Sequence, residues 1–222
     1  MMNKWIRRRR NTLGYGVQSP SDFYFVQHVL REQSPYYAYE AIHELHAQGH
    51  LPRHSEAIDR LLFRLANHIH PSLIVEVGAG TSVVAMSMAC PSSARCIAVV
   101  PSVQQAEAMR HIASEHPSIE VKNTDEMAIF SFLTPDDGPI GLLHIAHAER
   151  YAEVLDAALP HMAPHGLIIV EGIRSDRSRQ QWWTSLHGSQ ATGTSYDLGD
   201  IGLLALDPSR HAQAYWVKVR KR

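Results

Sequence analysis

The chain has 222 residues, of which 45% are hydrophobic and 19% are charged, a composition that fits one domain with a full-sized core. Lysine and arginine number 21 against 22 aspartates and glutamates, and the net charge of -1 excludes a general electrostatic preference for nucleic acid or acidic partners. No apolar run approaches the ~20 residues that cross a bilayer, and the N-terminus lacks the apolar segment of a signal peptide. We therefore expect a cytoplasmic protein without a membrane partner.

A basic cluster at the start of the chain, Lys4 to Arg10, departs from this charge balance. It contains Arg7-Arg-Arg-Arg10 and could contact the phosphates of RNA or of lipid headgroups, or it could be a solvated tail. A few arginines supply few of the contacts that charge-driven binding requires, so we do not expect nucleic acid as a partner.

The chain between Ser21 and His70 has the residue spacing of helices. Apolar residues recur on one helical face at Phe23, Val26, Val29 and Leu30, and on another at Ile58, Leu61, Leu62 and Leu65. We expect residues 1–70 to form a helical extension packed on the core of residues 71–222, so that the two parts make one folding unit.

The most informative stretch is Leu73-Ile-Val-Glu-Val-Gly-Ala-Gly-Thr-Ser82, where an apolar run ends in an acid and two glycines before a helix begins. Gly78 and Gly80 allow a sharp turn and the close approach of a ligand to the main chain. Thr81 or Ser82 can cap the helix that follows. The pattern predicts the entrance of a Rossmann-like nucleotide pocket, unless the glycines serve the turn alone.

Two residues in and beside this stretch argue against a dinucleotide ligand. The pyrophosphate-binding fingerprint needs a third glycine where this chain has Val83. Glu76, at the end of the expected strand, repels phosphate and attracts a cation such as an amino-acid ammonium group. The turn therefore favours a positively charged ligand without phosphate.

Strands and helices alternate beyond this turn in the order of a doubly wound sheet. We expect strands over Arg95–Val100, Ile119–Lys122, Ile140–Ile145 and Gly166–Val170, and helices over Val103–Glu115, Tyr151–Met162 and Asp176–Leu186. Ile201–Leu206 and Ala214–Val219 should close the chain as an antiparallel hairpin. The predicted fold class is α/β: a Rossmann-like, mostly parallel, seven-stranded sheet with helices on both faces and an antiparallel C-terminal hairpin.

The run Glu76-Val-Gly-Ala-Gly80 resembles the first motif of class I S-adenosylmethionine-dependent methyltransferases. From about Tyr15 onward the chain is similar to small bacterial O-methyltransferase-like proteins with an N-terminal helical extension. The residues that carry this likeness are Tyr15-Gly-Val-Gln-Ser-Pro20, Pro35-Tyr-Tyr37 and Leu61-Leu-Phe-Arg-Leu65. The resemblance implies S-adenosylmethionine as cofactor, its methionine half held by Glu76, Gly78, Ala79, Gly80, Thr81 and Ser82.

The chain departs from the family pattern at the end of the second strand, where an acid normally binds the ribose hydroxyls and this chain has Val100-Pro101. A lost charged hydrogen bond typically costs about 1.5–3 kcal/mol, which is roughly ten- to a hundredfold in affinity. We therefore expect the cofactor to bind more weakly, because Pro101 offers no acid to its ribose. Asp125, after the third strand, is placed to contact the adenine amino group, or else caps a helix.

A second departure concerns metal binding and catalysis. Ala146 stands where metal-dependent relatives of the catechol type have an acid, so we do not expect a magnesium site, and the 15 histidines show no zinc spacing. For metal-independent chemistry His147 is the candidate general base, and Glu171 the residue that orients His147 or the substrate. Either residue could instead belong to an ordinary loop.

The resemblance also implies that the N-terminal extension forms a lid and much of the acceptor pocket. The candidate substrate-contacting residues, which could alternatively serve only packing, are Tyr15, Gln18, Tyr36 and Tyr37.

We therefore predict a cytoplasmic S-adenosylmethionine-dependent methyltransferase that transfers a methyl group, without a metal, to an oxygen of an unidentified small-molecule acceptor. The alternative is a catalytically degenerate methyltransferase fold that serves as a binding or interaction module, motivated by the acids missing at Pro101 and Ala146. It predicts weak cofactor binding together with an exposed apolar patch or a stable oligomer such as a homodimer. A third hypothesis is an RNA methyltransferase that uses Arg7 to Arg10 as an electrostatic contact.

Overall fold

The computed structural model of the chain describes residue 17 and residues 19–48, 55–78, 80–146, 148–189, 193–209 and 211–219. Its strands are β1 (Leu73–Val77), β2 (Arg95–Val99), β3 (Ile119–Lys122), β4 (Ile140–Ile145), β5 (Met162–Glu171), β6 (Thr194–Asp197), β7 (Ile201–Ala205) and β8 (Ala214–Trp216). They form an eight-stranded sheet in the order β3-β2-β1-β4-β5-β7-β6-β8. Only β7 runs antiparallel to its described neighbours, β5 and β6.

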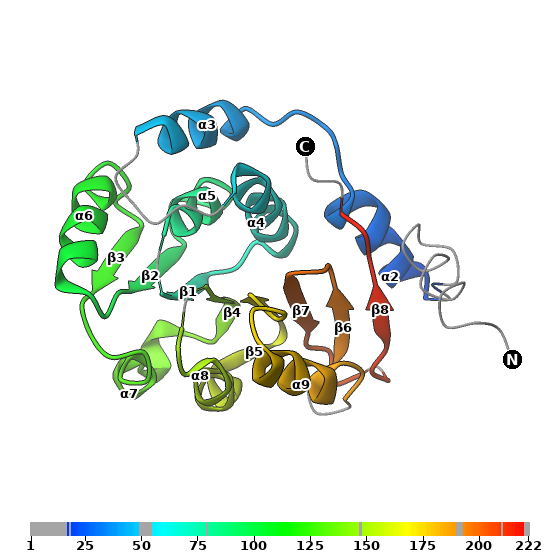
Figure 1. The fold of residues 1–222 in the computed structure, drawn as a ribbon. Coiled ribbons are helices and arrows are strands. Elements are labelled where there is room, and N and C mark those ends of the chain that lie inside the picture. Colours follow the sequence, from blue (N-terminus) through cyan, green and yellow to red (C-terminus); the bar gives the residue numbers. More distant parts are fainter. Residues whose placement is uncertain are drawn as a thin grey trace, which may run out of the picture.

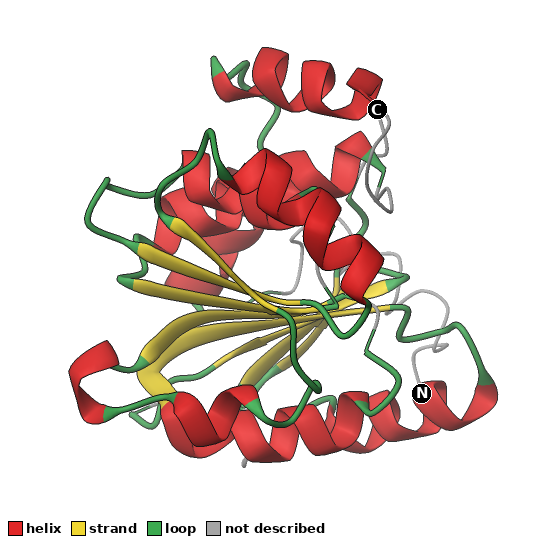
Figure 2. Cartoon of the chain, turned by 90° about the vertical axis from the view of Figure 1, so that its left-hand side faces the viewer, coloured by secondary structure: helices red, strands yellow, loops and turns green. Residues whose placement is uncertain are grey.

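Helices cover both faces of this sheet. They are α2 (Pro20–Phe25), the π-helical η1 (Val26–Leu30), α3 (Ala38–Gln48), α4 (Glu56–Ile69), α5 (Ser82–Met88), α6 (Val103–Ala113), α7 (Ile129–Phe132), α8 (Tyr151–Ala158) and α9 (Arg177–Leu186), with short 3-10 helices at η2 (Pro135–Asp137) and η3 (Leu159–His161). Figure 1 shows α4, α5 and α6 on one face, with α3 outside them, and α7, α8 and α9 on the other. Figure 2 shows the strands between the two helical layers.

The position of β1 inside the sheet explains why its residues are apolar except for Glu76. Its side chains alternate between the two faces, and all of them are buried. Ile74 packs in the core on the side of α4 and α5, whereas Val75 packs in the opposite core with Leu143 of β4. A strand covered on both faces needs apolar residues at consecutive positions, which is the pattern of a parallel α/β sheet.

The N-terminal extension docks on the far edge of the sheet through a buried carboxylate. Asp22 of α2 is 1% exposed and accepts hydrogen bonds from the hydroxyls of Tyr196 on β6 and Tyr215 on β8, each 3.0 Å long. Ser19 starts this helix, because its side chain accepts a hydrogen bond from the Asp22 main-chain N–H. The bonds of Asp22 thus join α2 to two strands near the other end of the chain.

The predicted fold class is confirmed, but the prediction of seven strands and the assignment of the hairpin need correction. The sheet has eight strands because Thr194–Asp197, which was not predicted as a strand, pairs with both β7 and β8. The antiparallel hairpin consists of β6 and β7, and Ala214–Trp216 runs parallel to β6. The segment 194–197 lacks an apolar strand pattern and was therefore missed. Its polar side chains can nevertheless be buried because they have partners, such as Arg174 for Asp197.

The helix expected over Tyr151–Met162 ends earlier, at Ala158. Pro160 lies in the 3-10 turn that follows, where it cannot donate the main-chain hydrogen bond that would continue an α-helix. Met162 therefore begins β5, which is longer than the predicted Gly166–Val170. None of the described helices is long and apolar enough to span a membrane.

Substitution of Gly202 by alanine should destabilise the sheet. A Cβ atom at Gly202 of β7 would lie 2.5 Å from two ring carbons of Trp183, a residue of α9 that is 3% exposed. Overpacking of this kind typically costs about 1–3 kcal/mol, and we expect the free energy of unfolding of Gly202→Ala to fall by that amount in urea denaturation. In a Trp183→Leu background the same substitution should cost less, and an equal cost in both backgrounds would contradict the steric explanation.

Candidate functional site

The glycine turn between β1 and α5 is fixed by hydrogen bonds that two of its main-chain N–H groups donate. Gly78 has a φ of 84°, which side chains other than hydrogen rarely allow, and its N–H donates to the carbonyl of Val99 on β2 at 3.0 Å. The N–H of Gly80 donates to Oε1 of Glu76 at 2.8 Å. The carboxylate of Glu76 therefore lies against the turn that follows its own strand.

The start of α5 is hydrogen-bonded to helix α4 of the N-terminal extension. The hydroxyl of Thr81 donates to Oδ2 of Asp59 at 2.6 Å, and the same oxygen lies 2.7 Å from Nε2 of His46. Asp59 is fully buried on α4. Thr81 therefore bonds to α4 and does not cap α5, and neither does Ser82, whose buried hydroxyl has no hydrogen-bond partner among the described residues.

A buried cluster of two carboxylates and a histidine lies beside this turn. Glu76 and His144 are register partners on β1 and β4, and Nδ1 of His144 lies 2.9 Å from Oε2 of Glu76. The other ring nitrogen, Nε2, lies 2.9 Å from Oε1 of Glu171 at the end of β5. Glu76 and His144 are 0% exposed and Glu171 is 7% exposed. We call these three residues the Glu76–His144–Glu171 cluster.

Both ring nitrogens of His144 must carry a proton, because an ionised carboxylate can only accept hydrogen bonds. Burial by itself would lower the pKa of His144, but the hydrogen bonds and charges of Glu171 and Glu76 outweigh that effect and raise the pKa to about 10. At neutral pH a protonated His144 thus lies between Glu76 and Glu171. Glu76 is the member of the cluster that also faces the glycine turn, because its other oxygen accepts the N–H of Gly80.

The end of β2 carries no acid. Val100 is buried and Pro101 is exposed, and their carbonyls accept hydrogen bonds of 2.8 and 3.2 Å from the side-chain amide of Asn123. Asp125 is exposed, and its Oδ1 accepts a hydrogen bond of 2.9 Å from the main-chain N–H of Met127. Asp125 therefore caps the turn that leads into α7.

The end of β4 is equally free of acids. Ala146 is buried, and its N–H donates to the carbonyl of Val77 at 3.0 Å. In the part of the chain that the structure describes, no three His, Cys, Asp or Glu side chains are grouped to hold a metal ion.

Apart from Pro101 and Asp125, the predicted site residues fall into three groups. Four of them, Tyr15, Gln18, Ala79 and His147, lie outside the described residues. Glu76 and Glu171 come together through His144, and Gly78, Gly80, Thr81 and Ser82 form the adjoining turn. Tyr36 and Tyr37 diverge, since Tyr36 donates to Glu32 at 3.1 Å and packs on Tyr39, whereas Tyr37 is fully exposed.

Sequence reasoning missed two ionisable residues of this region, His144 and Asp59. His144 interrupts the otherwise apolar run of β4, and an ionisable side chain in a fully buried strand needs a partner of opposite charge. Glu76, an acid in a neighbouring buried strand, was the signal that could have identified the pair. Asp59 carried no comparable signal, because an acid in the first turn of a helix is common.

No protein-family model and no curated protein matches the chain. Among solved structures, it is similar to a methyltransferase from Geobacter sulfurreducens, with 18% identity, a TM-score of 0.62 and coverage of 86% of this chain and 98% of that one. The O-methyltransferase TomG from Streptomyces achromogenes, solved with S-adenosylmethionine, has 18% identity, a TM-score of 0.63 and coverage of 84% and 96%. An O-methyltransferase from Bacillus cereus, solved with S-adenosylhomocysteine, has 17% identity, a TM-score of 0.60 and coverage of 85% and 98%. The chain therefore has the fold of class I methyltransferases.

The cluster should make stability depend on pH in the alkaline range. The pKa of His144 is raised from 6.5 to about 10, so its stabilising effect is complete below about pH 6.5 and is lost as the pH rises through 10. We expect the free energy of unfolding, measured in urea between pH 7 and 10, to fall more steeply for the wild type than for His144→Gln. The control is His165→Gln, which changes a histidine with a 73% exposed side chain and should keep the wild-type slope. Equal slopes for wild type and His144→Gln would refute the assigned charge.

Proposed function

We propose that the chain is an S-adenosylmethionine-dependent methyltransferase that acts without a metal on an oxygen atom of a small molecule. The observation that carries this proposal is the buried acidic side chain of Glu76, which the Glu76–His144–Glu171 cluster holds against the glycine turn. The class I methyltransferase fold supports it, and two proteins of similar structure were solved with S-adenosylmethionine or S-adenosylhomocysteine.

Glu76 complements the charge of the proposed cofactor. S-adenosylmethionine carries an ammonium, a sulfonium and a carboxylate, so it has one net positive charge and no phosphate. Glu76 places an acidic side chain directly against the turn. Opposite charges in a poorly solvated site attract more strongly than in water, which favours this ligand over a dinucleotide.

The residues of the turn fit the methionine half of the cofactor. The positive φ of Gly78 opens the main chain to close approach, and the buried hydroxyl of Ser82 has no partner among the described residues that would compete with a ligand. When bound, the cofactor would supply the methyl group on its sulfonium. The remaining work of this chain is to align the acceptor oxygen with that group, and such alignment can be worth about 7–11 kcal/mol.

We assign the proton-accepting role to His147, which follows β4 and lies outside the described residues. Glu171 ends the neighbouring strand and is the most exposed member of the cluster, so we assign it the role of orienting the acceptor while it holds His144. With an acceptor in hand, a His147→Ala variant that retains full turnover would remove the first assignment.

The charge match can be tested by titration calorimetry. Glu76→Gln should weaken S-adenosylmethionine binding by roughly ten- to a hundredfold, because a charged interaction is lost. Binding of S-adenosylhomocysteine, which lacks the sulfonium charge, should weaken less. The control is Glu120→Gln on β3, whose side chain is 44% exposed and which should bind both ligands as the wild type does. Equal affinity of Glu76→Gln and wild type for S-adenosylmethionine would refute the role of the cluster.

An acidic residue that could bind the ribose hydroxyls can be introduced after β2. Pro101 is exposed directly after β2, at the place where the family resemblance implies an acid. We expect Pro101→Asp to raise the affinity for S-adenosylmethionine by about tenfold, the effect of one charged hydrogen bond. Pro101→Asn supplies an uncharged side chain of the same shape and should give a smaller gain. An unchanged affinity of Pro101→Asp would place the ribose elsewhere.

The alternative of a binding module is favoured by one observation, the lack of acids after both β2 and β4, at Pro101 and Ala146. It predicts no thermal stabilisation of the wild type by millimolar S-adenosylmethionine and a stable oligomer in analytical ultracentrifugation. The enzyme hypothesis predicts stabilisation, since a ligand at about 100 times its dissociation constant contributes roughly 2.7 kcal/mol.

A further inference from the structure

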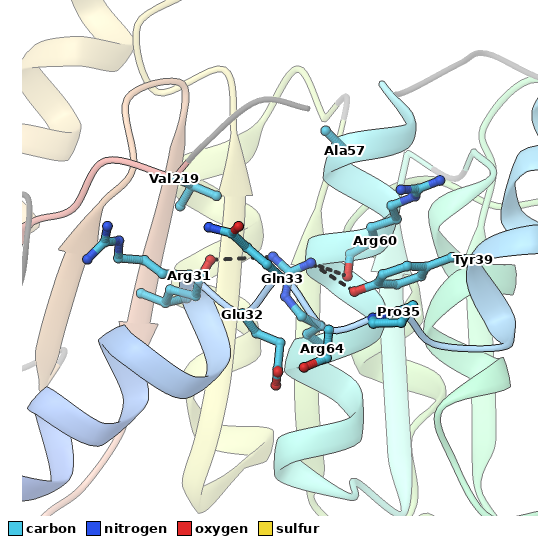
Figure 3. Close-up of a pocket in the computed structure, with 11 residues that line it drawn as sticks. Arg31, Glu32, Gln33, Pro35, Tyr39, Ala57, Arg60, Arg64 and Val219 are labelled. Carbon is cyan, nitrogen blue, oxygen red and sulfur yellow. Dashed lines mark hydrogen bonds between the residues drawn. The ribbon is translucent and has the colours of Figure 1, made fainter.

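A cavity of about 230 Å³ lies between α4, the segment that follows η1 and Val219 (Figure 3). Its lining consists of residues 30–35, Tyr39, Ala57, Arg60, Arg64 and Val219. None of these residues belongs to the glycine turn or to the Glu76–His144–Glu171 cluster. The cavity is therefore distinct from the proposed cofactor site, although α4 contributes to both through different side chains.

Arg64 occupies the middle of this group, with Arg31 and Arg60 extending to either side of it (Figure 3). It is 8% exposed. Its Nε donates to the carbonyl of Val29 at 2.9 Å, its Nη1 to the hydroxyl of Tyr39 at 3.0 Å and to the carbonyl of Arg60 at 3.2 Å, and its Nη2 to the carbonyl of Leu30 at 3.4 Å. Every one of these acceptors is neutral.

The buried guanidinium thus has hydrogen bonds but no ion-pair partner within the described part of the chain, where no ion pair includes Arg64. A purely structural role explains the bonds, because a cation favours the carbonyls at the end of a helix such as η1. It does not explain the lack of a direct ion pair, since buried arginines are normally paired.

The other charged side chains around the cavity have partners of their own. Arg60 forms an ion pair with Glu56 and lies over the ring of Tyr39, 4.8 Å from its centroid. Arg31 donates from Nη1 to Oε1 of Gln27 at 3.2 Å. The pKa of Glu32, which also lines the cavity, is lowered chiefly by a hydrogen bond from Ser34 and also by the charge of Arg64.

We propose that this cavity binds a small monocarboxylate, with the carboxylate on Arg64 and the apolar part against Leu30, Pro35 and Val219. A guanidinium suits a carboxylate because it is planar and always charged, and the four bonds of Arg64 leave one N–H of Nη2 to donate to the ligand. The volume is below the ~300–1,000 Å³ of pockets for drug-sized molecules, which restricts the ligand to a small compound. The site requires neither a methyl donor nor the glycine turn.

Fluorine NMR titration of the full-length protein tests this with a matched pair of probes, 4-(trifluoromethyl)benzoate and 4-(trifluoromethyl)benzamide. The two have the same shape, and only the first is charged. We expect the benzoate to bind at least about tenfold more tightly than the amide, the effect of one charged hydrogen bond. Equal binding of the two probes, or equally effective competition by inorganic phosphate, would overturn the proposal.

Variants locate the bound probe. Arg64→Met removes the charge, and because it also removes the bonds to Val29 and Leu30, its folding is checked by thermal unfolding. Ala57→Leu fills the cavity without touching Arg64, and it keeps the test valid if Arg64→Met does not fold. Both should weaken benzoate binding at least about tenfold, whereas Arg177→Gln, an exposed arginine on α9, should not. Wild-type affinity of Ala57→Leu would refute the site.

Saturating S-adenosylmethionine should leave benzoate binding unchanged, and displacement of the benzoate would place the probe in the cofactor site and overturn the proposal. Benzoate binding in a protein that fails to bind S-adenosylmethionine would refute the proposed function and leave this site intact.

Discussion

The two hydrogen bonds of a buried imidazolium hold the centre of this molecule together. His144 lies between Glu76 and Glu171, so its charge joins β1, β4 and β5 near the carboxyl ends of these strands. Without the proton on His144, two carboxylates would face a neutral ring in a fully buried position, which carries a large desolvation cost. The position of the glycine turn depends on the same bonds, because Glu76 also accepts the N–H of Gly80.

Helix α4 connects this centre to the N-terminal extension. Its Asp59 bonds to Thr81 at the start of α5 and to His46 on α3, while its Arg64 bonds to the last carbonyls of η1. One helix therefore fixes the glycine turn on one side and shapes a charged cavity on another. The extension is thus part of the structure that positions the site, and its contacts to the core are polar and buried as well as apolar.

The features that the sequence predicted correctly have local signals. Apolar runs marked β1 to β5, and the glycines of the turn after Glu76 required a bend. The features that were missed depend on distant partners: β6 is polar, and its Asp197 is satisfied by Arg174, while His144 bonds to residues 68 and 27 positions away. The adjacent Tyr36 and Tyr37 show the same limit, because one is partly buried on Tyr39 and the other fully exposed for reasons that no spacing encodes.

The bonds of Asp22 constrain the order in which the chain can fold. Its carboxylate must find hydroxyls 174 and 193 positions further along, and closing so long a loop carries an entropy cost that only the finished sheet edge can repay. During synthesis α2 leaves the ribosome well before its partners on β6 and β8. The hydrogen bonds of Asp22 can therefore form only after the strands between them have been synthesised.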